Sequence, residues 1–179
     1  MVRQPPDETR VEERVFGDDL ITLAVPNSYF VGDPDDDLSA LADRAGLPAE
    51  VDLTGLLGDA QADILVWGYD VESPTSFVVI KNEDYAAMPL GIISNYAGSI
   101  MGDRVEILQE DRLTIAGRDT LRWITLTSEA GVEFTQAVYL FKDAGVLYLV
   151  VFNADRQAVA AQLSNYDAIV ASLRIDKLE

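Results

Sequence analysis

The densest group of side chains that could do chemistry is a run of aspartates at residues 33–37. Asp33, Asp35 and Asp37 stand at alternate positions, the spacing with which a loop offers oxygen ligands to a hard cation such as Ca²⁺. The rest of the EF-hand pattern fails, because Leu38 stands where glycine is needed and Arg44 where a bidentate glutamate belongs. The run is therefore a candidate metal site, and its alternative is a solvated loop whose last aspartate caps a helix.

Other catalytic chemistry would have to come from paired carboxylates. The chain has no histidine and no cysteine, which excludes serine–histidine triads, thiol nucleophiles, thiolate zinc sites and iron–sulfur clusters. Asp70, Glu106 and Glu133 lie in or beside predicted strands and could act as acid and base if they met across a sheet. Among 31 acidic residues such pairs also arise by chance, so these three residues are weak evidence for an enzyme. We expect no cofactor, with Ca²⁺ as the alternative.

Composition limits the class of protein and its partners. The 179 residues carry a net charge of −18. Nucleic acid is therefore not an expected partner, because it releases no counterions when it meets so acidic a surface. Apolar residues make up 49%, enough for a full core in one domain. No apolar stretch reaches the roughly 18 residues that span a bilayer.

Turn residues divide the first half into short elements. Residues 11–16 and 20–25 flank a Gly-Asp-Asp turn, which predicts a hairpin, and Pro26 ends its second strand. Apolar residues repeat with helical spacing over residues 38–45, where Asp37 is the expected N-cap, and again from residue 92 to residue 101. Between these helices, residues 62–69 and 76–81 predict two strands.

The second half is rich in predicted strands, at residues 104–109, 113–115, 121–127, 133–141 and 146–153. Turn residues separate them, Asp111 and Gly117 among them, and a helix from Asp155 to Leu173 closes the chain. Short turns favour antiparallel pairing, and the helices fall early, midway and late. We therefore predict an α+β fold in which a mainly antiparallel meander sheet is covered by helices on both faces.

Several aromatic side chains are ambiguous between core and binding site. Five of them could line an apolar pocket between sheet and helix or simply fill the core: Trp67, Tyr69, Phe77, Tyr85 and Tyr96. Trp123 alternates with Leu121 and Thr125, and it would form an interaction patch if its sheet face were uncovered.

The layout resembles the PsbP-like fold family, which includes the extrinsic photosystem subunit, a Ran-binding nuclear import factor and many bacterial lipoproteins. The resemblance covers about residues 10–175. It rests on the hairpin strand that ends at Pro26, the glycine of Ile115-Ala116-Gly117 before a long strand, the meander at residues 133–153, and a last helix with Ser172 near its end. It implies an antiparallel sheet between helices and an accessory or binding role. The photosystem subunit's histidine-linked metal contacts are not carried over, because histidine is absent.

Three functions follow as hypotheses. The first is a non-enzymatic accessory domain that binds a protein or small ligand, is extracytoplasmic, and is tethered to a membrane through a lipid anchor that has been removed. The second is a carboxylate- or divalent-metal-dependent enzyme, and the third is a cytoplasmic acidic partner of a basic protein. We predict a flexible tether at residues 1–12, one globular domain at residues 13–176 and a cloning-derived tail at residues 177–179.

Overall fold

The computed structural model describes residues 11–16, 21–32, 63–70, 72–73, 75–96, 105–129 and 132–175. The candidate metal ligands Asp33, Asp35 and Asp37 lie outside these ranges, as does the predicted helix at residues 38–45. Most of the predicted tether and the predicted tail are outside as well, and the first strand begins at Val11. These predictions, and the domain boundaries, stay predictions.

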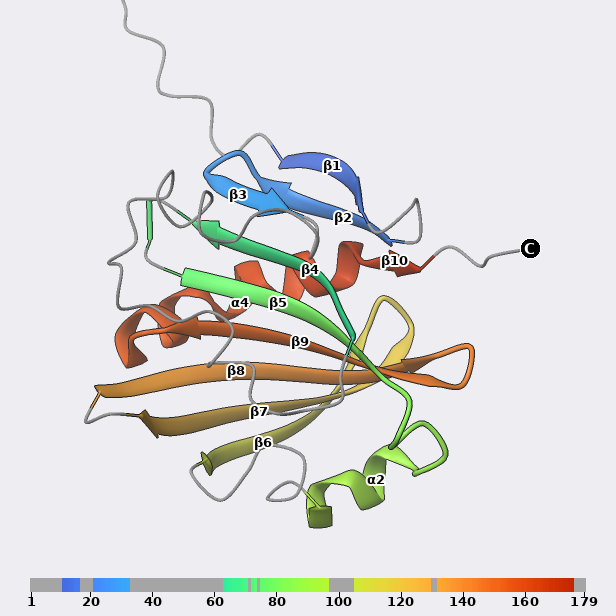
Figure 1. The fold of residues 1–179 in the computed structure, drawn as a ribbon. Helices are drawn as coiled ribbons and strands as arrows, with labels where there is room; N and C mark the ends of the chain where they lie inside the picture. The colour runs from blue at the N-terminus through green and yellow to red at the C-terminus, as the bar shows by residue number, and fades with distance from the viewer. Residues whose placement is uncertain are drawn as a thin grey trace, which may run out of the picture.

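The predicted opening hairpin is confirmed. Strands β1 (Val11–Phe16) and β2 (Ile21–Pro26) pair antiparallel. On the other side of β2 lies β10 (Arg174–Ile175), a two-residue strand that the sequence pattern did not predict. These three strands form a small sheet in the order β1-β2-β10, which brings the two ends of the described chain together (Figure 1).

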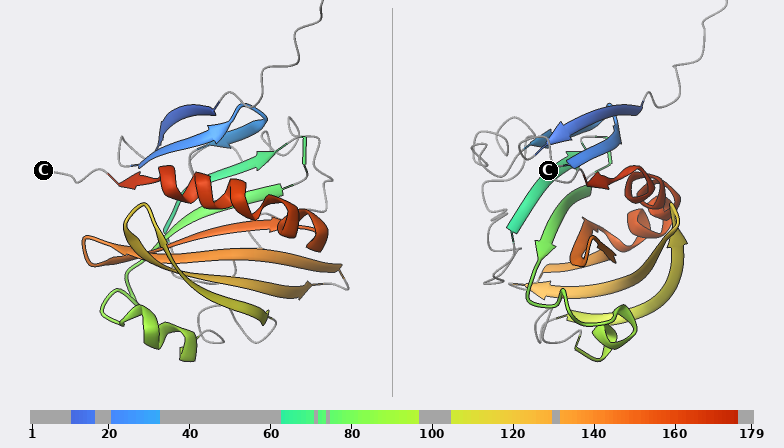
Figure 2. Two further views of the ribbon diagram at one scale, coloured as in Figure 1. Left: turned by 180° about the vertical axis from the view of Figure 1, so that it is seen from behind. Right: turned by 90° about the vertical axis from the view of Figure 1, so that its right-hand side faces the viewer.

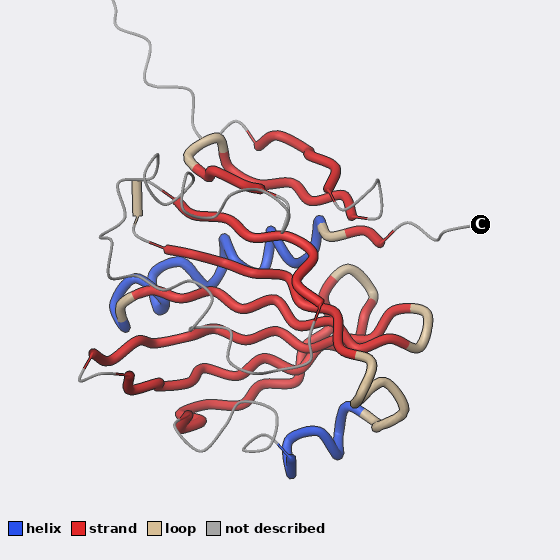
Figure 3. Tube along the Cα trace, in the orientation of Figure 1, coloured by secondary structure: helices blue, strands red, loops and turns tan. Residues whose placement is uncertain are grey.

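A larger sheet of seven strands follows the order β3-β4-β5-β9-β8-β7-β6, and every pairing in it is antiparallel. Its strands are β3 (Tyr29–Gly32), β4 (Asp63–Asp70), β5 (Thr75–Asn82), β6 (Val105–Ile115), β7 (Arg118–Glu129), β8 (Val132–Asp143) and β9 (Val146–Ala154). Strands β6 to β9 are the predicted meander, and β9 then pairs with β5 of the first half. The prediction of a mainly antiparallel sheet is confirmed (Figure 3).

Strand β6 corrects one predicted turn. We expected Asp111 to separate two strands, but β6 runs through it without interruption. The reason lies across the strand pair, where Arg122 stands opposite Asp111 and its Nη2 is 2.9 Å from the carboxylate. An aspartate whose charge is satisfied by a cross-strand arginine no longer favours a turn. The only shift of register between β6 and β7 lies instead between Ile107 and Gln109.

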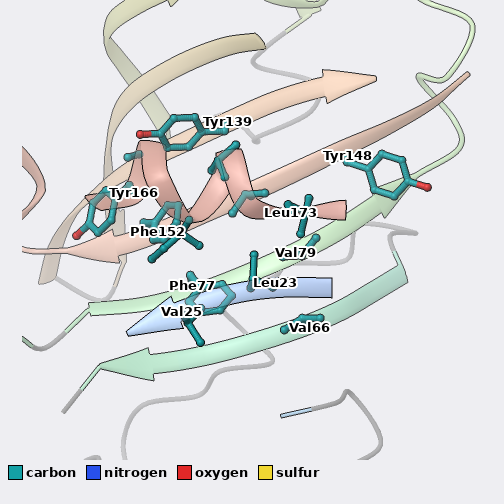
Figure 4. Close-up of a cluster of buried hydrophobic side chains, with 14 of the residues drawn as sticks. Leu23, Val25, Val66, Phe77, Val79, Tyr139, Tyr148, Phe152, Tyr166 and Leu173 are labelled. Carbon is teal, nitrogen blue, oxygen red and sulfur yellow. The ribbon is translucent and has the colours of Figure 1, made fainter. Parts of the chain in front are cut away.

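The predicted closing helix is confirmed as α4 (Arg156–Ser172). Asp155 caps it as expected, because its Oδ1 accepts hydrogen bonds from the backbone N–H groups of Gln157 and Ala158, both at 2.8 Å. The buried face of α4 packs between the two sheets, in one core cluster with residues of β2, β5, β8 and β9. Tyr166 of the helix stacks on Phe152 of β9 with ring centroids 4.2 Å apart (Figure 4). Seen end-on, the larger sheet curves around this helix (Figure 2, right).

The C-terminal end of α4 is held by an arginine of β7 and by a serine of the helix itself. Nη2 and Nη1 of Arg118 donate to the carbonyl oxygens of Val170 at 2.6 Å and Leu173 at 3.0 Å, where a helix leaves its carbonyls unpaired. The hydroxyl of Ser172 accepts from the N–H of Ala24 on β2 at 3.0 Å. Ser172 therefore supplies a hydrogen bond that the short strand β10 does not reach.

The opposite face of the larger sheet carries a second apolar cluster. The helical elements described on this side are α2 (Leu90–Ile93) and the 3₁₀ turn η2 (Ser94–Tyr96), which are shorter than the helix predicted from residue 92 to residue 101. Residues 97–101 lie outside the described chain. The long helix α4 covers one face only, so the prediction of helices on both faces is not confirmed by the described residues. No helix among them is both long and apolar enough to cross a membrane.

Candidate interaction surface

The three carboxylates considered for acid–base chemistry do not meet. Asp70 lies on β4 and Glu106 on β6, and four strands separate them in the sheet order. Glu133 lies on β8 opposite Ser128, whereas Glu106 lies opposite Leu126, so β7 stands between these two. Both glutamates are exposed. The strand arrangement therefore builds no acid–base pair from these residues.

Asp70 is buried, but a turn accounts for it. Its two carboxylate oxygens accept from the backbone N–H of Glu72 at 3.0 Å and from the hydroxyl of Ser73 at 2.7 Å. These bonds close the connection between β4 and β5, as an aspartate at the start of a turn does. Burial, and to a lesser degree the charge of Asp70, raises the pKa of Tyr29, so this tyrosine stays protonated.

The candidate metal ligands cannot be placed, because Asp33, Asp35 and Asp37 lie outside the described residues. Within the described ranges, no three carboxylate side chains gather in a way that could hold a metal ion. The Ca²⁺ site stays a prediction.

Arg122 is the centre of an ion-pair network that the sequence did not predict. Its guanidinium lies 2.9 Å from Asp111 on β6 and 3.1 Å from Asp167 on α4, and its side chain is only 12% exposed. The hydroxyl of Tyr139 on β8 donates to Asp167 at 2.6 Å. Hydrogen bonds from Arg122 and from Gln109 lower the pKa of Asp111. The network links α4 to three strands, so its role is to stabilise the fold.

A second network crosses the sheet face that lies away from α4. Gln136 accepts from the hydroxyls of Thr125 and Thr127, both at 3.1 Å, and its Nε2 donates to Asn153 at 2.7 Å. Nδ2 of Asn153 donates to Ser76 at 3.3 Å, so the chain of bonds spans β7, β8, β9 and β5. The sequence feature that could have revealed this network is a glutamine and an asparagine within otherwise apolar strands. Each of these side chains has a partner, so the network stabilises the pairing of the strands.

The aromatic residues predicted as core or pocket do not share one site. Phe77 is buried in the cluster that contains α4, whereas Tyr85 packs against the cluster on the opposite face. Trp67 is buried, and Tyr96 is exposed. These positions favour the core interpretation over a common pocket.

The surface with the clearest binding character is formed by residues 82–96 and the sheet residues next to them, Glu110, Arg112, Asp119 and Trp123. We call it the α2 corner (Figure 1, lower right). Ile93 and Trp123 are both 0% exposed and belong to the same cluster, so the helix is anchored on the sheet through them. Trp123 is thus covered, so the condition under which it would form an interaction patch is not met.

Two apolar side chains of the α2 corner remain outside. Ile92 is 44% exposed and Tyr96 is 46% exposed, although Ile93 between them is fully buried. The sheet side of the corner is polar: the indole Nε1 of Trp123 donates to Glu110 at 2.9 Å, and Arg112 forms two hydrogen bonds to Asp119, at 3.0 and 2.6 Å. Exposed apolar side chains on a segment that packs beside polar and charged sheet residues are typical of a protein-binding surface.

Comparison with known proteins shows likeness at the level of structure. No protein-family model and no curated protein matches this chain. Three solved structures match over nearly their whole length, each with 14% sequence identity. Cyanobacterial PsbP (CyanoP) from Synechocystis sp. PCC 6803 has a TM-score of 0.53, with 98% of each chain covered.

The other two structures come from a yeast and a mycobacterium. The Ran-binding protein Mog1p of Saccharomyces cerevisiae has a TM-score of 0.56, covering 94% of this chain and 96% of its own. LpqN of Mycobacterium tuberculosis, a protein involved in cell envelope biogenesis, has a TM-score of 0.51, covering 96% of this chain and 93% of its own. At 14% identity the likeness shows the fold alone: this chain has the PsbP-like fold.

Proposed function

We propose that the protein is a non-catalytic binding or accessory domain that acts by contacting another protein. One observation carries the proposal. The ion-paired and hydrogen-bonded side chains of Asp70, Arg122 and Gln136 stabilise turns, helix and sheet, whereas the apolar side chains of Ile92 and Tyr96 are 44% and 46% exposed. A surface that exposes apolar side chains on an anchored element favours association with a partner.

The structural neighbours support this proposal by analogy. Mog1p is described as a Ran-binding protein, so one protein with this fold binds a protein partner. Fold alone does not determine function, so the choice of partner has to come from the surface of this chain. A small ligand is the alternative, and it would need a cavity rather than a protruding corner.

The proposal is tested by crosslinking in the native host. The wild-type chain and the variant I92S/Y96S would be expressed at equal levels, and V15S would serve as control, because Val15 is 52% exposed on β1 of the other sheet. We expect one defined partner to be crosslinked by wild type and by V15S and to be lost with I92S/Y96S. Equal recovery with all three chains, or turnover of a small molecule by the purified protein, would contradict the proposal.

We infer an extracytoplasmic location for this domain. The involvement of LpqN in cell envelope biogenesis supports it, although only the fold is shared. Fractionation of the native host tests the inference, and recovery of the protein in the cytoplasmic fraction would refute it.

The metal-dependent alternative rests on the spacing of Asp33, Asp35 and Asp37. We expect no change in Tm when about 1 mM CaCl₂ replaces EDTA, because the EF-hand pattern fails at Leu38 and Arg44. A ligand that prefers the native state raises Tm, by several degrees when it is present far above its Kd. A Ca²⁺-dependent rise in Tm that disappears in D35N would therefore support the metal site.

A further inference from the structure

We infer that the α2 corner docks a protein segment that presents an apolar side chain next to lysine or arginine. The inference rests on the proposed function and adds the location of the contact and the chemistry of the partner. It is carried by three properties of the corner: a fixed position, exposed apolar side chains, and carboxylates that pair with no cation among the described residues.

The corner is held in place before any partner binds. The backbone N–H groups of Ile92 and Ile93 donate to the carbonyl oxygen of Pro89 at 2.9 and 3.2 Å, which closes the turn of α2. Nζ of Lys142 on β8 donates to the carbonyl oxygen of Ala86, so the loop before the helix is tied to the sheet. A surface fixed in this way loses little conformational entropy on binding.

The segment that Ile93 anchors also carries two exposed apolar side chains. Ile93 packs into the cluster around Trp123, whereas Ile92 is 44% exposed and Tyr96 is 46% exposed. A tyrosine beside an isoleucine gives a partner both apolar area and a hydroxyl to bond, as in many binding surfaces.

The charge offered at the corner is negative. Each described cation of the corner and its border is engaged inside the chain: Arg112 with Asp119, Lys81 with Glu83, and Lys142 with a carbonyl oxygen. Asp84, by contrast, is exposed and forms no hydrogen bond or ion pair within the described ranges. Glu110 uses Oε2 for the indole of Trp123, and its Oε1 has no hydrogen bond among the described residues.

Net charge decides between a second copy and a different partner. Each chain carries −18, so two copies would bring like charges together, including Asp84 and Glu110 of both. A partner with lysine or arginine beside its apolar anchor would instead be steered toward the corner.

The experiment uses the full chain and a synthetic amphipathic helical peptide of leucine and lysine as the probe. Peptides with serine in place of leucine, or glutamate in place of lysine, separate the apolar part from the charged part. Affinity is measured by fluorescence anisotropy at about 0.02 M and about 0.3 M NaCl, across which screening becomes strong. Size-exclusion chromatography checks whether the chain pairs with itself.

We expect the leucine–lysine peptide to bind and to lose about tenfold in affinity at the higher salt. I92S/Y96S should weaken binding about tenfold or more at both salt concentrations, whereas V15S should not. D84N/E110Q should weaken binding mainly at low salt. Glu72 is exposed on the far turn between β4 and β5, so E72Q is the matched charge control and should leave the affinity unchanged.

The outcomes separate this inference from the proposed function. If I92S/Y96S weakens binding but D84N/E110Q and salt do not, the cationic chemistry is wrong and the protein-binding surface stands. If the corner variants and the control V15S behave alike, or the peptide fails to bind, the docking inference is overturned, while the crosslinking test still judges the proposed function. A dimer in solution that I92S/Y96S dissociates would overturn the choice of partner.

Discussion

Gly68 fixes the position of an aromatic ring in the core. It is buried on β4 opposite Phe77, and a Cβ at this position would lie 2.2 Å from Cε1 of that ring. Phe77 itself is packed between Tyr29 and Phe152, with ring centroids at 5.6 and 5.7 Å, so it has little room to move. The glycine is therefore required by a close approach, which the strand pattern alone did not reveal.

We predict that Gly68→Ala lowers the free energy of unfolding by about 1–3 kcal/mol, the usual cost of inserting atoms into a packed core. Urea unfolding monitored by circular dichroism measures it. Gly91→Ala is the control, because a Cβ there meets only Nη1 of Arg112 at an ordinary 3.7 Å. Equal stability of Gly68→Ala and wild type would mean that Phe77 can shift without cost.

Two hairpins turn through an alanine with positive φ. Ala116 has a φ of 50° and Ala144 a φ of 48°, and each is followed by a glycine that also has positive φ. This is the backbone of a two-residue type I′ turn, where asparagine is favoured before glycine and alanine is strained.

We predict that Ala144→Asn raises the free energy of unfolding by up to about 1 kcal/mol, since asparagine adopts the left-handed conformation more readily. The residue is exposed, so packing should not change. Thermal and urea unfolding measure the gain. Gly145→Ala should act in the opposite direction, because its φ is 84°, and an increase in stability there would contradict the turn assignment.

At the scale of elements, the Arg122 network joins α4 to β6, β7 and β8. Hydrogen bonds from Arg122 and Gln109 hold the pKa of Asp111 below its ordinary value, so the folded state favours the charged carboxylate. A lowered folded pKa contributes stability that is fully present above the unfolded pKa, about 3.9, and is lost as pH falls through the folded pKa.

We predict that Arg122→Met lowers the free energy of unfolding by about 1–3 kcal/mol at neutral pH, because it leaves two carboxylates and a tyrosine without their cation. The difference from wild type should shrink below about pH 4, as Asp111 becomes protonated. Urea unfolding at several pH values measures both effects. Arg112→Met serves as control, since the Arg112–Asp119 pair is exposed and its loss should not be measurable; a constant difference at all pH values would contradict the electrostatic explanation.

Local sequence patterns predicted the helices and strands better than they predicted which of these elements pair with one another. Alternation gave the strands of the meander, and Asp155 with its helical spacing gave α4, because these signals lie within a few residues. The pairing of β5 with β9 depends on residues 76 and 153, which no local signal connects. Asp111 was misread for the same reason: an aspartate favours a turn until Arg122 is placed opposite it. Ile92, Ile93 and Tyr96 all fitted a helical period, but only the packing in the structure shows that Ile93 is buried whereas Ile92 and Tyr96 are exposed.

At the scale of the whole molecule, net charge sets the response to salt. A charge of −18 on one chain favours expansion through self-repulsion, and NaCl screens this repulsion over a Debye length of about 10 Å at 0.1 M. Salt also weakens ion pairs such as Arg112–Asp119, but exposed pairs contribute little.

We therefore predict that Tm rises by several degrees between about 0.02 and about 0.5 M NaCl, since 1 kcal/mol corresponds to about 2–4 °C in a chain of this size. Differential scanning calorimetry at neutral pH measures the shift, and choline chloride should give the same rise if screening is the cause. At about pH 4, where many carboxylates are protonated, the rise should diminish. A fall in Tm with salt at neutral pH would mean that the ion pairs outweigh the repulsion among the acidic residues.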